Sequence, residues 1–244
     1  MNILTFLIIG YLGFTVGPAK VEKAVFGADA MTEVFEVQNF TDDSLRIKVE
    51  FEDFSIDETG EVTFYAPGHF VNSLAPRAVV NPEEFVIPPK SIERLRVTFS
   101  LPSSEVLAEY YSMLLFKSRP IPMRYSTAIN VAGEIGVPVY YTIPQYANKS
   151  ASFDSFQLKN DSLEIVLSNN GNVHLRIKGE AIITTFDTRI MQQDSLPEFV
   201  VMPGNQRRLR IGIDEDIGEG GYLAKIILDY GSLELIVGER KFYK

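Results

Sequence analysis

An internal repeat limits the fold of this chain more than any other feature of its sequence. Three groups of residues recur in the same order in the two halves. The matched segments are residues 37–39 and 45–48 with 167–169 and 175–178, residues 85–96 with 199–210, and residues 110–116 with 222–228. The offset falls from 130 in the first pair to 114 in the second, so the first copy holds 16 additional residues between Val49 and Glu84. The repeat predicts two homologous domains, the first with an insertion.

Both copies of the repeat are predicted to consist of β-strands. Short segments alternate polar with apolar residues and are rich in β-branched and aromatic types, and no dozen residues keep a helical period. The predicted strands include residues 33–37, 45–51, 95–99, 163–167, 173–177 and 209–213. About 100 residues per copy with frequent turns predicts an all-β protein with two immunoglobulin-like β-sandwich domains in tandem. Tyr110 and Tyr222 each open a late strand and are either corner tyrosines or ordinary core residues.

Composition excludes several functional classes. Asp and Glu number 32 against 23 Lys and Arg, a net charge of −9 that disfavours binding to a nucleic-acid backbone. Cysteine is absent, which excludes disulfides, thiolate metal sites and a cysteine nucleophile. The hydrophobic content of 45% is that of a globular chain with a real core.

The first residues resemble a signal peptide. Residues 3–16 are apolar and carry no charged side chain, and the first charge is Lys20. Such a run is too short for a transmembrane helix, which needs about 20 apolar residues. We expect residues 1–13 to be a signal peptide of an exported protein; the alternative is that this segment is a buried first strand.

One long strand is predicted before the second copy. Apolar residues fall on odd positions from Ile129 to Tyr141, with polar or small residues between them. Pro138 cannot donate to a ladder, so this strand is expected at a sheet edge. The predicted first domain spans residues 14–143, a linker follows at 144–151, and the second domain spans residues 152–244.

With these segments in view, the chain resembles the periplasmic pilus-assembly chaperones, the two-domain partners of outer-membrane ushers. The resemblance covers most of the chain. It rests on residues 14–21, 35–39, 81–97 and 129–144 in the first domain and on residues 163–177, 200–211 and 221–231 in the second. It implies a divergent member of that family.

The resemblance implies a binding protein and no enzymatic activity or cofactor. In the family the chaperone lends an edge strand to a pilin-like subunit that lacks its own last strand, and the usher then receives the complex. In this sequence the lent strand corresponds to residues 129–137. The implied subunit-binding residues are Lys20, Ile129, Val131, Gly133, Ile135 and Val137. The implied location is the periplasm.

The resemblance also implies an anchor for the subunit's terminal carboxylate, made from two basic residues. Lys20 matches the first. Gly136 stands where the family has the second basic residue. Of this pair, only Lys20 would then remain to bind the buried carboxylate of the subunit. Arg124 is an alternative second cation.

Other functions have weaker signals. His69 and His174 fall in different predicted domains, and neither forms a recognisable metal or catalytic motif. Residues 214–216 and Glu219 are acidic but lack the order of ligands in an EF-hand, so a solvated turn is the simpler interpretation. The main alternative to a chaperone is a structural or adhesive surface module, in which two sandwich domains act as spacers.

Overall fold

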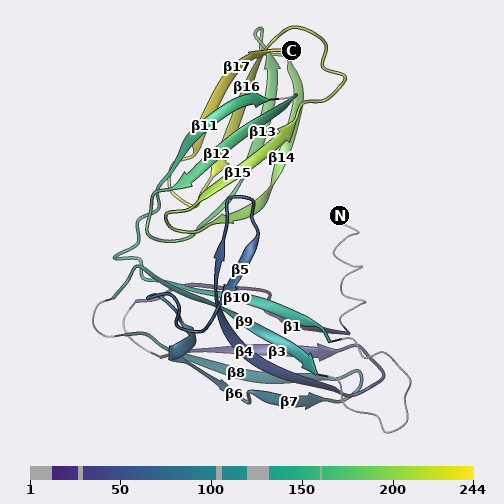
Figure 1. Cartoon of the computed structure of the whole chain (residues 1–244), viewed down its shortest axis with the longest axis vertical. Coiled ribbons are helices and arrows are strands. Elements are labelled where there is room, and N and C mark those ends of the chain that lie inside the picture. The colour runs from purple at the N-terminus through teal and green to yellow at the C-terminus, as the bar shows by residue number, and fades with distance from the viewer. Residues whose placement is uncertain (1–12, 27–29, 103–105, 120–131, 160) are drawn as a thin grey trace. The chain divides into compact units, whose positions relative to one another are not determined.

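The computed structural model describes residues 13–26, 30–102, 106–119, 132–159 and 161–244, and it is almost entirely β (Figure 1). The one helix in those ranges is a turn of 3-10 helix, Ala75–Arg77. No helix within them is long and apolar enough to cross a bilayer. Residues 129 and 131, and Arg124, lie outside the described residues.

The chain divides into two compact units. Unit 1 comprises residues 1–54 and 64–144, and unit 2 comprises residues 55–63 and 145–244. Unit 2 therefore includes the tip of a hairpin whose two strands also extend into unit 1, an arrangement that the sequence pattern did not predict.

Unit 1 is built from two facing sheets. One has the strand order β1-β3-β8-β6, and the other has the order β2-β10-β9-β4-β5, with β7 also paired to β4. The strands are β1 Phe14–Gly17, β2 Val21–Ala24, β3 Ala30–Asn39, β4 Leu45–Ile56, β5 Val62–Tyr65, β6 Ala78–Asn81, β7 Glu84–Ile87, β8 Ile92–Ser100, β9 Glu109–Arg119 and β10 Glu134–Thr142. Phe35, Leu95, Phe116 and Val139 are fully or almost fully buried between the sheets, as period-2 strands require.

The start of the chain changes sheets. β1 pairs antiparallel with β3 in the first sheet. After the residues from Pro18 to Lys20, β2 pairs parallel with β10 in the second, with Val21 opposite Val139. Both sheets are thereby joined along this side of unit 1.

Part of the insertion pairs directly with β9 of the second sheet, through a parallel bridge between Ser73 and Tyr111. Asp53 is fully buried and accepts hydrogen bonds from Ser73 Oγ at 2.5 Å, Ser112 Oγ at 3.0 Å and the Phe70 N–H at 3.0 Å. Tyr111 is buried beside Phe54, with ring centroids 5.4 Å apart. A buried carboxylate with three donors thus fixes the insertion to β4 and β9.

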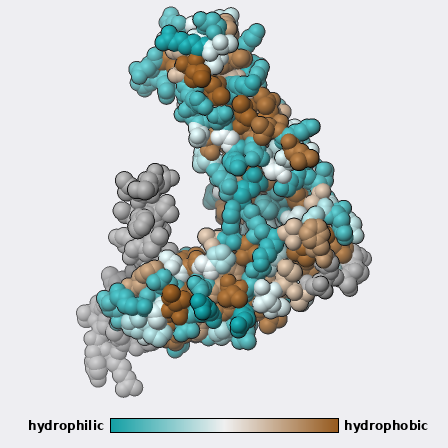
Figure 2. All heavy atoms as spheres, turned by 180° about the vertical axis from the view of Figure 1, so that it is seen from behind, coloured by the Kyte–Doolittle hydropathy of each residue, from teal (hydrophilic) through white to brown (hydrophobic). Residues whose placement is uncertain are grey.

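Unit 2 is a second sandwich, with sheets ordered β11-β12-β15 and β14-β13-β16-β17. Its strands are β11 Ala151–Lys159, β12 Ser162–Asn169, β13 Leu175–Thr185, β14 Ile190–Val201, β15 Gln206–Gly212, β16 Gly221–Asp229 and β17 Ile236–Tyr243. Leu163, Ile177 and Ile226 are fully buried between the sheets. On the face seen in Figure 2, hydrophobic patches lie among hydrophilic areas on the surface of each unit.

The repeat seen in the sequence has a structural cause. Asn39 Nδ2 donates to the carbonyls of Asp43 and Ile87, and Asn169 Nδ2 donates to those of Val173 and Val201. Both amides are buried. Each joins the turn that follows its own strand to the end of a later strand of the same unit.

The two tyrosines of the repeat also match. Tyr222 Oη donates to the Gly218 carbonyl at 2.9 Å, and the Leu107 N–H donates to Tyr110 Oη at 3.0 Å. Each phenol thus bonds backbone three or four residues upstream, which is the arrangement of corner tyrosines. The predicted fold class, two immunoglobulin-like β-sandwiches, is confirmed.

Candidate strand-pairing edge

β10 has two neighbours along one part of its length and a single neighbour along the rest. Its whole length, from Glu134 to Thr142, pairs antiparallel with β9. Its other side pairs with β2 only from Val139 to Thr142. Within the ranges that the structure describes, residues 134–138 therefore form an open sheet edge.

The register shows which backbone groups point to that edge. The Ser118 N–H donates to the Gly133 carbonyl at 2.8 Å, and the Ile143 N–H donates to the Ala108 carbonyl at 2.8 Å, so odd residues bond to the β9 side. The carbonyl of Thr142 accepts from Val25 on the β2 side, so even residues point the other way. Glu134 and Gly136 thus direct two N–H and two C=O groups outward.

Pro138 marks the end of this open segment. It is the next even residue, and its missing N–H is on the outward side, where no β9 ladder bond is lost. The parallel ladder with β2 begins at the following residue, Val139. The predicted edge position of Pro138 agrees with this register.

Side chains of the odd residues face the core of unit 1. Val137 and Val139 are fully buried there, and Ile135 is partly buried against the same cluster. Val137, predicted to bind a subunit, is therefore a core side chain of its own domain in this structure. Gly133 is buried and its N–H donates to Ser118 Oγ at 2.7 Å. Ile135 is thus the first side chain in the described part of the series, since Gly133 has none, and it is partly buried.

Gly136 is exposed and has two large side chains of β9 beside it. A Cβ atom at Gly136 would lie 3.0 Å from Met113 Sδ and 3.4 Å from Leu115 Cδ2. Both of these side chains are buried. The position at which the resemblance implied a lysine is therefore flanked by apolar side chains from the neighbouring strand.

A charged network lies at the start of β10 on the outer face. Lys117 Nζ is 3.0 Å from Glu50, 3.2 Å from Glu52 and 3.6 Å from Glu134. Hydrogen bonds from Lys48 and then Lys117 lower the pKa of Glu50 to about 2. The hydrogen bond with Glu50 in turn raises the pKa of Lys117. This network joins β4, β9 and the first residue of β10.

Lys20 lies where β2 begins. It directly precedes Val21, the partner of Val139, so it is opposite Pro138 in the parallel register. Its side chain is 45% exposed and its ammonium is 4.0 Å from Glu22. The lysine is thus placed at the end of the open segment of β10.

The two histidines and the acidic turn have structural surroundings of their own. His69 stacks on Tyr65 with ring centroids 4.6 Å apart, which makes it part of the aromatic cluster of the insertion. His174 is 9% exposed in unit 2. Lys244 Nζ donates to the Asp214 carbonyl in the acidic turn. Among the described residues, no group of three or more His, Asp or Glu side chains could hold a metal ion.

Sequence reasoning missed the contribution of the backbone. It selected side chains on odd positions, but the outward backbone groups belong to the even residues Glu134 and Gly136. The presence of Pro138 at an even position was the available signal, because proline is tolerated where its N–H would point away from the ladder.

Comparison with known proteins gives a result by structure alone, since no family model and no curated protein matches the sequence. The class 5 fimbriae chaperone CfaA superposes with a TM-score of 0.53 at 16% identity, over 93% of this chain and 98% of that chain. A chaperone–tip adhesin complex of CFA/I fimbriae gives 0.52 at 14% identity, over 93% and 98%. The CsuC–CsuE complex from the archaic Csu pili of Acinetobacter baumannii gives 0.50 at 11%, over 93% and 97%.

These structures are chaperones of pilus assembly or their complexes with tip subunits. Their likeness extends over nearly the whole of both chains. The chain therefore has the two-domain fold of these pilus chaperones, and the resemblance seen in the sequence is confirmed at the level of the fold.

Proposed function

We propose that this protein is a periplasmic chaperone-like protein that binds a pilin-like subunit by pairing β10 with it. The observation that supports this most is the open edge at Glu134 and Gly136, which directs four backbone hydrogen-bonding groups away from β9. An edge of this kind pairs readily with an extended segment of another chain.

The positions of β2 and Lys20 support a parallel direction for the bound strand. β2 runs parallel to β10 and occupies the same side from Val139 onward. A partner strand parallel to β10 along residues 134–137 would end where β2 begins. Its terminal carboxylate would then lie beside Lys20, which would bind it through a charge-assisted hydrogen bond.

Side chains give this pairing its specificity. Ile135 is partly buried at the end of the core of unit 1. The same odd series continues in the sequence through Gly133 to Val131 and Ile129, the last two outside the described residues. In the proposal, Ile129, Val131 and Ile135 fill the groove that an incomplete subunit leaves open. Gly133 and Val137 add no side chain to that groove, because Gly133 has none and Val137 is buried in the core of unit 1.

The anchor differs from the one that the resemblance implied. Gly136 has no side chain and is flanked by Met113 and Leu115, so Lys20 acts without a second cation from this position of β10. More of the binding energy then comes from backbone pairing and apolar side chains than in a site with two cations. Arg124, outside the described residues, is the remaining candidate for a second cation.

The partner class comes from the fold and from two of its relatives. Those structures are described as complexes of a chaperone with a tip adhesin or a tip adhesion subunit. We infer a pilin-like protein subunit as the ligand, an outer-membrane usher as a later partner, and export directed by residues 1–13. The role requires no cofactor and no catalytic residue.

Co-purification tests this function. The tagged full-length chain is isolated from its own host, and the proposal expects one small β-rich polypeptide in a 1:1 complex. The double variant Ile129→Ser/Val131→Asn should lose that polypeptide and keep its melting temperature. A spacer module would instead bring down no such subunit, and the double variant would melt several degrees lower because both residues would be core side chains.

A further inference from the structure

A second strand edge, on unit 2, is covered by the hairpin tip that belongs to that unit. β15 is the last strand of the sheet β11-β12-β15. The Asn169 N–H donates to the Asn205 carbonyl at 3.0 Å and β15 continues in this register, so its odd residues bond to β12. The even residues Gln206, Arg208, Arg210 and Gly212 therefore point their backbone groups away from the sheet.

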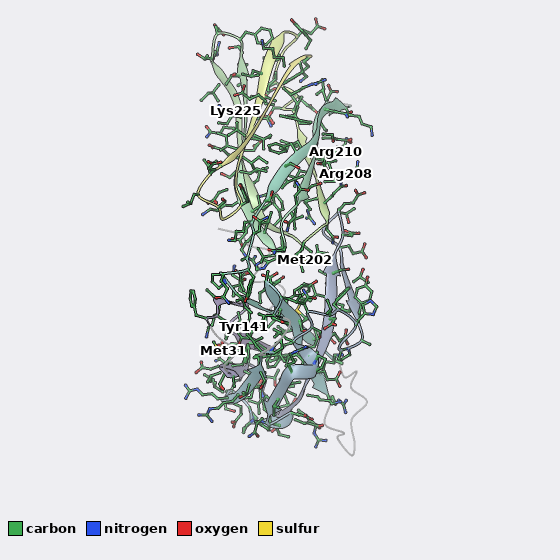
Figure 3. The ribbon with its side chains drawn as sticks, turned by 90° about the vertical axis from the view of Figure 1, so that its left-hand side faces the viewer. Met31, Tyr141, Met202, Arg208, Arg210 and Lys225 are labelled. Carbon is green, nitrogen blue, oxygen red and sulfur yellow. The ribbon has the colours of Figure 1, made fainter. Side chains whose placement is uncertain are left out.

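Two of these outward residues are bonded by other parts of unit 2. The Arg208 N–H donates to the Glu58 carbonyl at 2.7 Å. The Gly212 carbonyl accepts from Gln192 Nε2 at 2.8 Å. Arg210 lies between them on the same edge, and Figure 3 labels Arg208 and Arg210 in succession along this strand.

The tip has a preformed shape. Asp57 Oδ1 accepts from the N–H groups of Thr59, Gly60 and Glu61 at 2.8 to 2.9 Å. Gly60 has a φ of +94°, which favours glycine. These bonds hold the turn closed and direct the Glu58 carbonyl outward, toward Arg208.

Side chains complete the contact between the tip and β15. Arg208 Nη2 donates to both carboxylate oxygens of Glu58, at 3.2 Å to Oε1 and 3.1 Å to Oε2. Asn205 Nδ2 donates to the Ile56 carbonyl at 3.0 Å. The Arg207 guanidinium lies against Gly60, where a Cβ would be 1.7 Å from Nη1, and 5.8 Å from the centre of the Phe199 ring. The tip thus matches this edge in shape, charge and hydrogen bonding.

We propose that residues 55–63 are an edge cap, which prevents β15 from pairing with a strand of another copy of this chain. Edge strands that expose free N–H and C=O groups associate with other strands unless they are covered or charged. The tip covers Arg208, Gln192 covers Gly212, and the charge of Arg210 protects the residue between them. This inference is independent of the subunit-binding role of β10.

The test shortens the hairpin in the full chain, replacing residues 57–61 with an Asn-Gly turn. Amide exchange is measured by NMR at a concentration at which both proteins are monomeric. It should show Arg208 protected in the wild type and exchanging at least tenfold faster in the shortened variant, because its acceptor is gone. The Leu209 amide, which faces β12, should stay protected in both and serves as the internal control.

Association is measured on the same proteins by sedimentation velocity at increasing concentration. The shortened variant should form larger species than the wild type. Adding Arg208→Pro should reverse this, because the proline removes an outward N–H without removing a bond to β12. An Arg208 amide that exchanges equally fast in wild type and variant, or a shortened variant that sediments as the wild type does, would overturn the proposal.

Discussion

Gly136 of β10 and Met113 of β9 are fitted to each other: a Cβ on the glycine would lie 3.0 Å from Sδ and 3.3 Å from Cγ of the methionine. The two residues are diagonal neighbours on adjacent strands. Gly136 is opposite Leu115, and Met113 is opposite Pro138, two residues further along β10. The absence of a side chain at position 136 therefore determines how the outer face of this edge packs.

This fit predicts a coupling between the two positions. Gly136→Ala should lower the free energy of unfolding by about 1 kcal/mol, because the new methyl group displaces a buried side chain. In a Met113→Ala background the same change should cost nothing. Chemical denaturation of the four proteins gives the coupling energy.

Gly212→Ala is the matched control for that experiment. Gly212 is also a strand glycine, but a Cβ there would meet no atom within 4 Å. Its substitution should be neutral or slightly stabilising, through the lower entropy of the unfolded chain. An equal cost at both positions would show that the effect is a property of strand glycines and not of the contact with Met113.

The fold was largely predictable because its signals are local or repeated. The buried amides of Asn39 and Asn169 account for the repeat, and alternation identified the strands around them. The tip at residues 55–63 was not predictable, because its contact joins Glu58 to Arg208 across 150 positions and leaves no periodic pattern. For Val137, alternation gave the face correctly but could not show where the sandwich core of unit 1 ends.

The Glu50 carboxylate predicts a dependence of stability on acid pH. Its pKa falls from 4.5 to about 2 in the folded chain, through Lys48 and then Lys117. The stabilisation from this group is complete above pH 4.5 and is lost as the pH falls toward 2, because the unfolded chain binds the proton more tightly. Denaturation curves across this range should show a smaller decline for Glu50→Gln than for the wild type. Lys48→Met should reduce the decline without removing the carboxylate, and an unchanged pH profile in both variants would contradict the assignment.

Lys20 is expected to act in binding and not in folding. Lys20→Ala should weaken capture of the subunit by about 1 to 3 kcal/mol, the cost of losing a charge-assisted hydrogen bond. Its melting temperature should stay near that of the wild type, because its side chain is 45% exposed and its contact with Glu22 is a long surface pair. Titration of the subunit into both proteins measures the difference. Equal affinities would remove Lys20 from the site.

The central claim is that the open edge of β10 pairs with the subunit. Two single proline substitutions at adjacent positions test it. Glu134→Pro removes an N–H that points away from β9, so the sandwich should keep its stability. Ile135→Pro removes an N–H directed at β9 and should destabilise unit 1 by about 3 kcal/mol. Glu134→Ala keeps the N–H and removes the contact of Glu134 with Lys117, which controls for the side chain.

Capture of the co-purifying subunit by Glu134→Pro and Glu134→Ala, compared at equal concentration, is the most direct measurement. If β10 pairs with the subunit through its outward backbone groups, the alanine variant binds as the wild type does and the proline variant loses most of its binding while remaining folded. A folded Glu134→Pro protein that captures the subunit with wild-type affinity would contradict strand pairing at this edge.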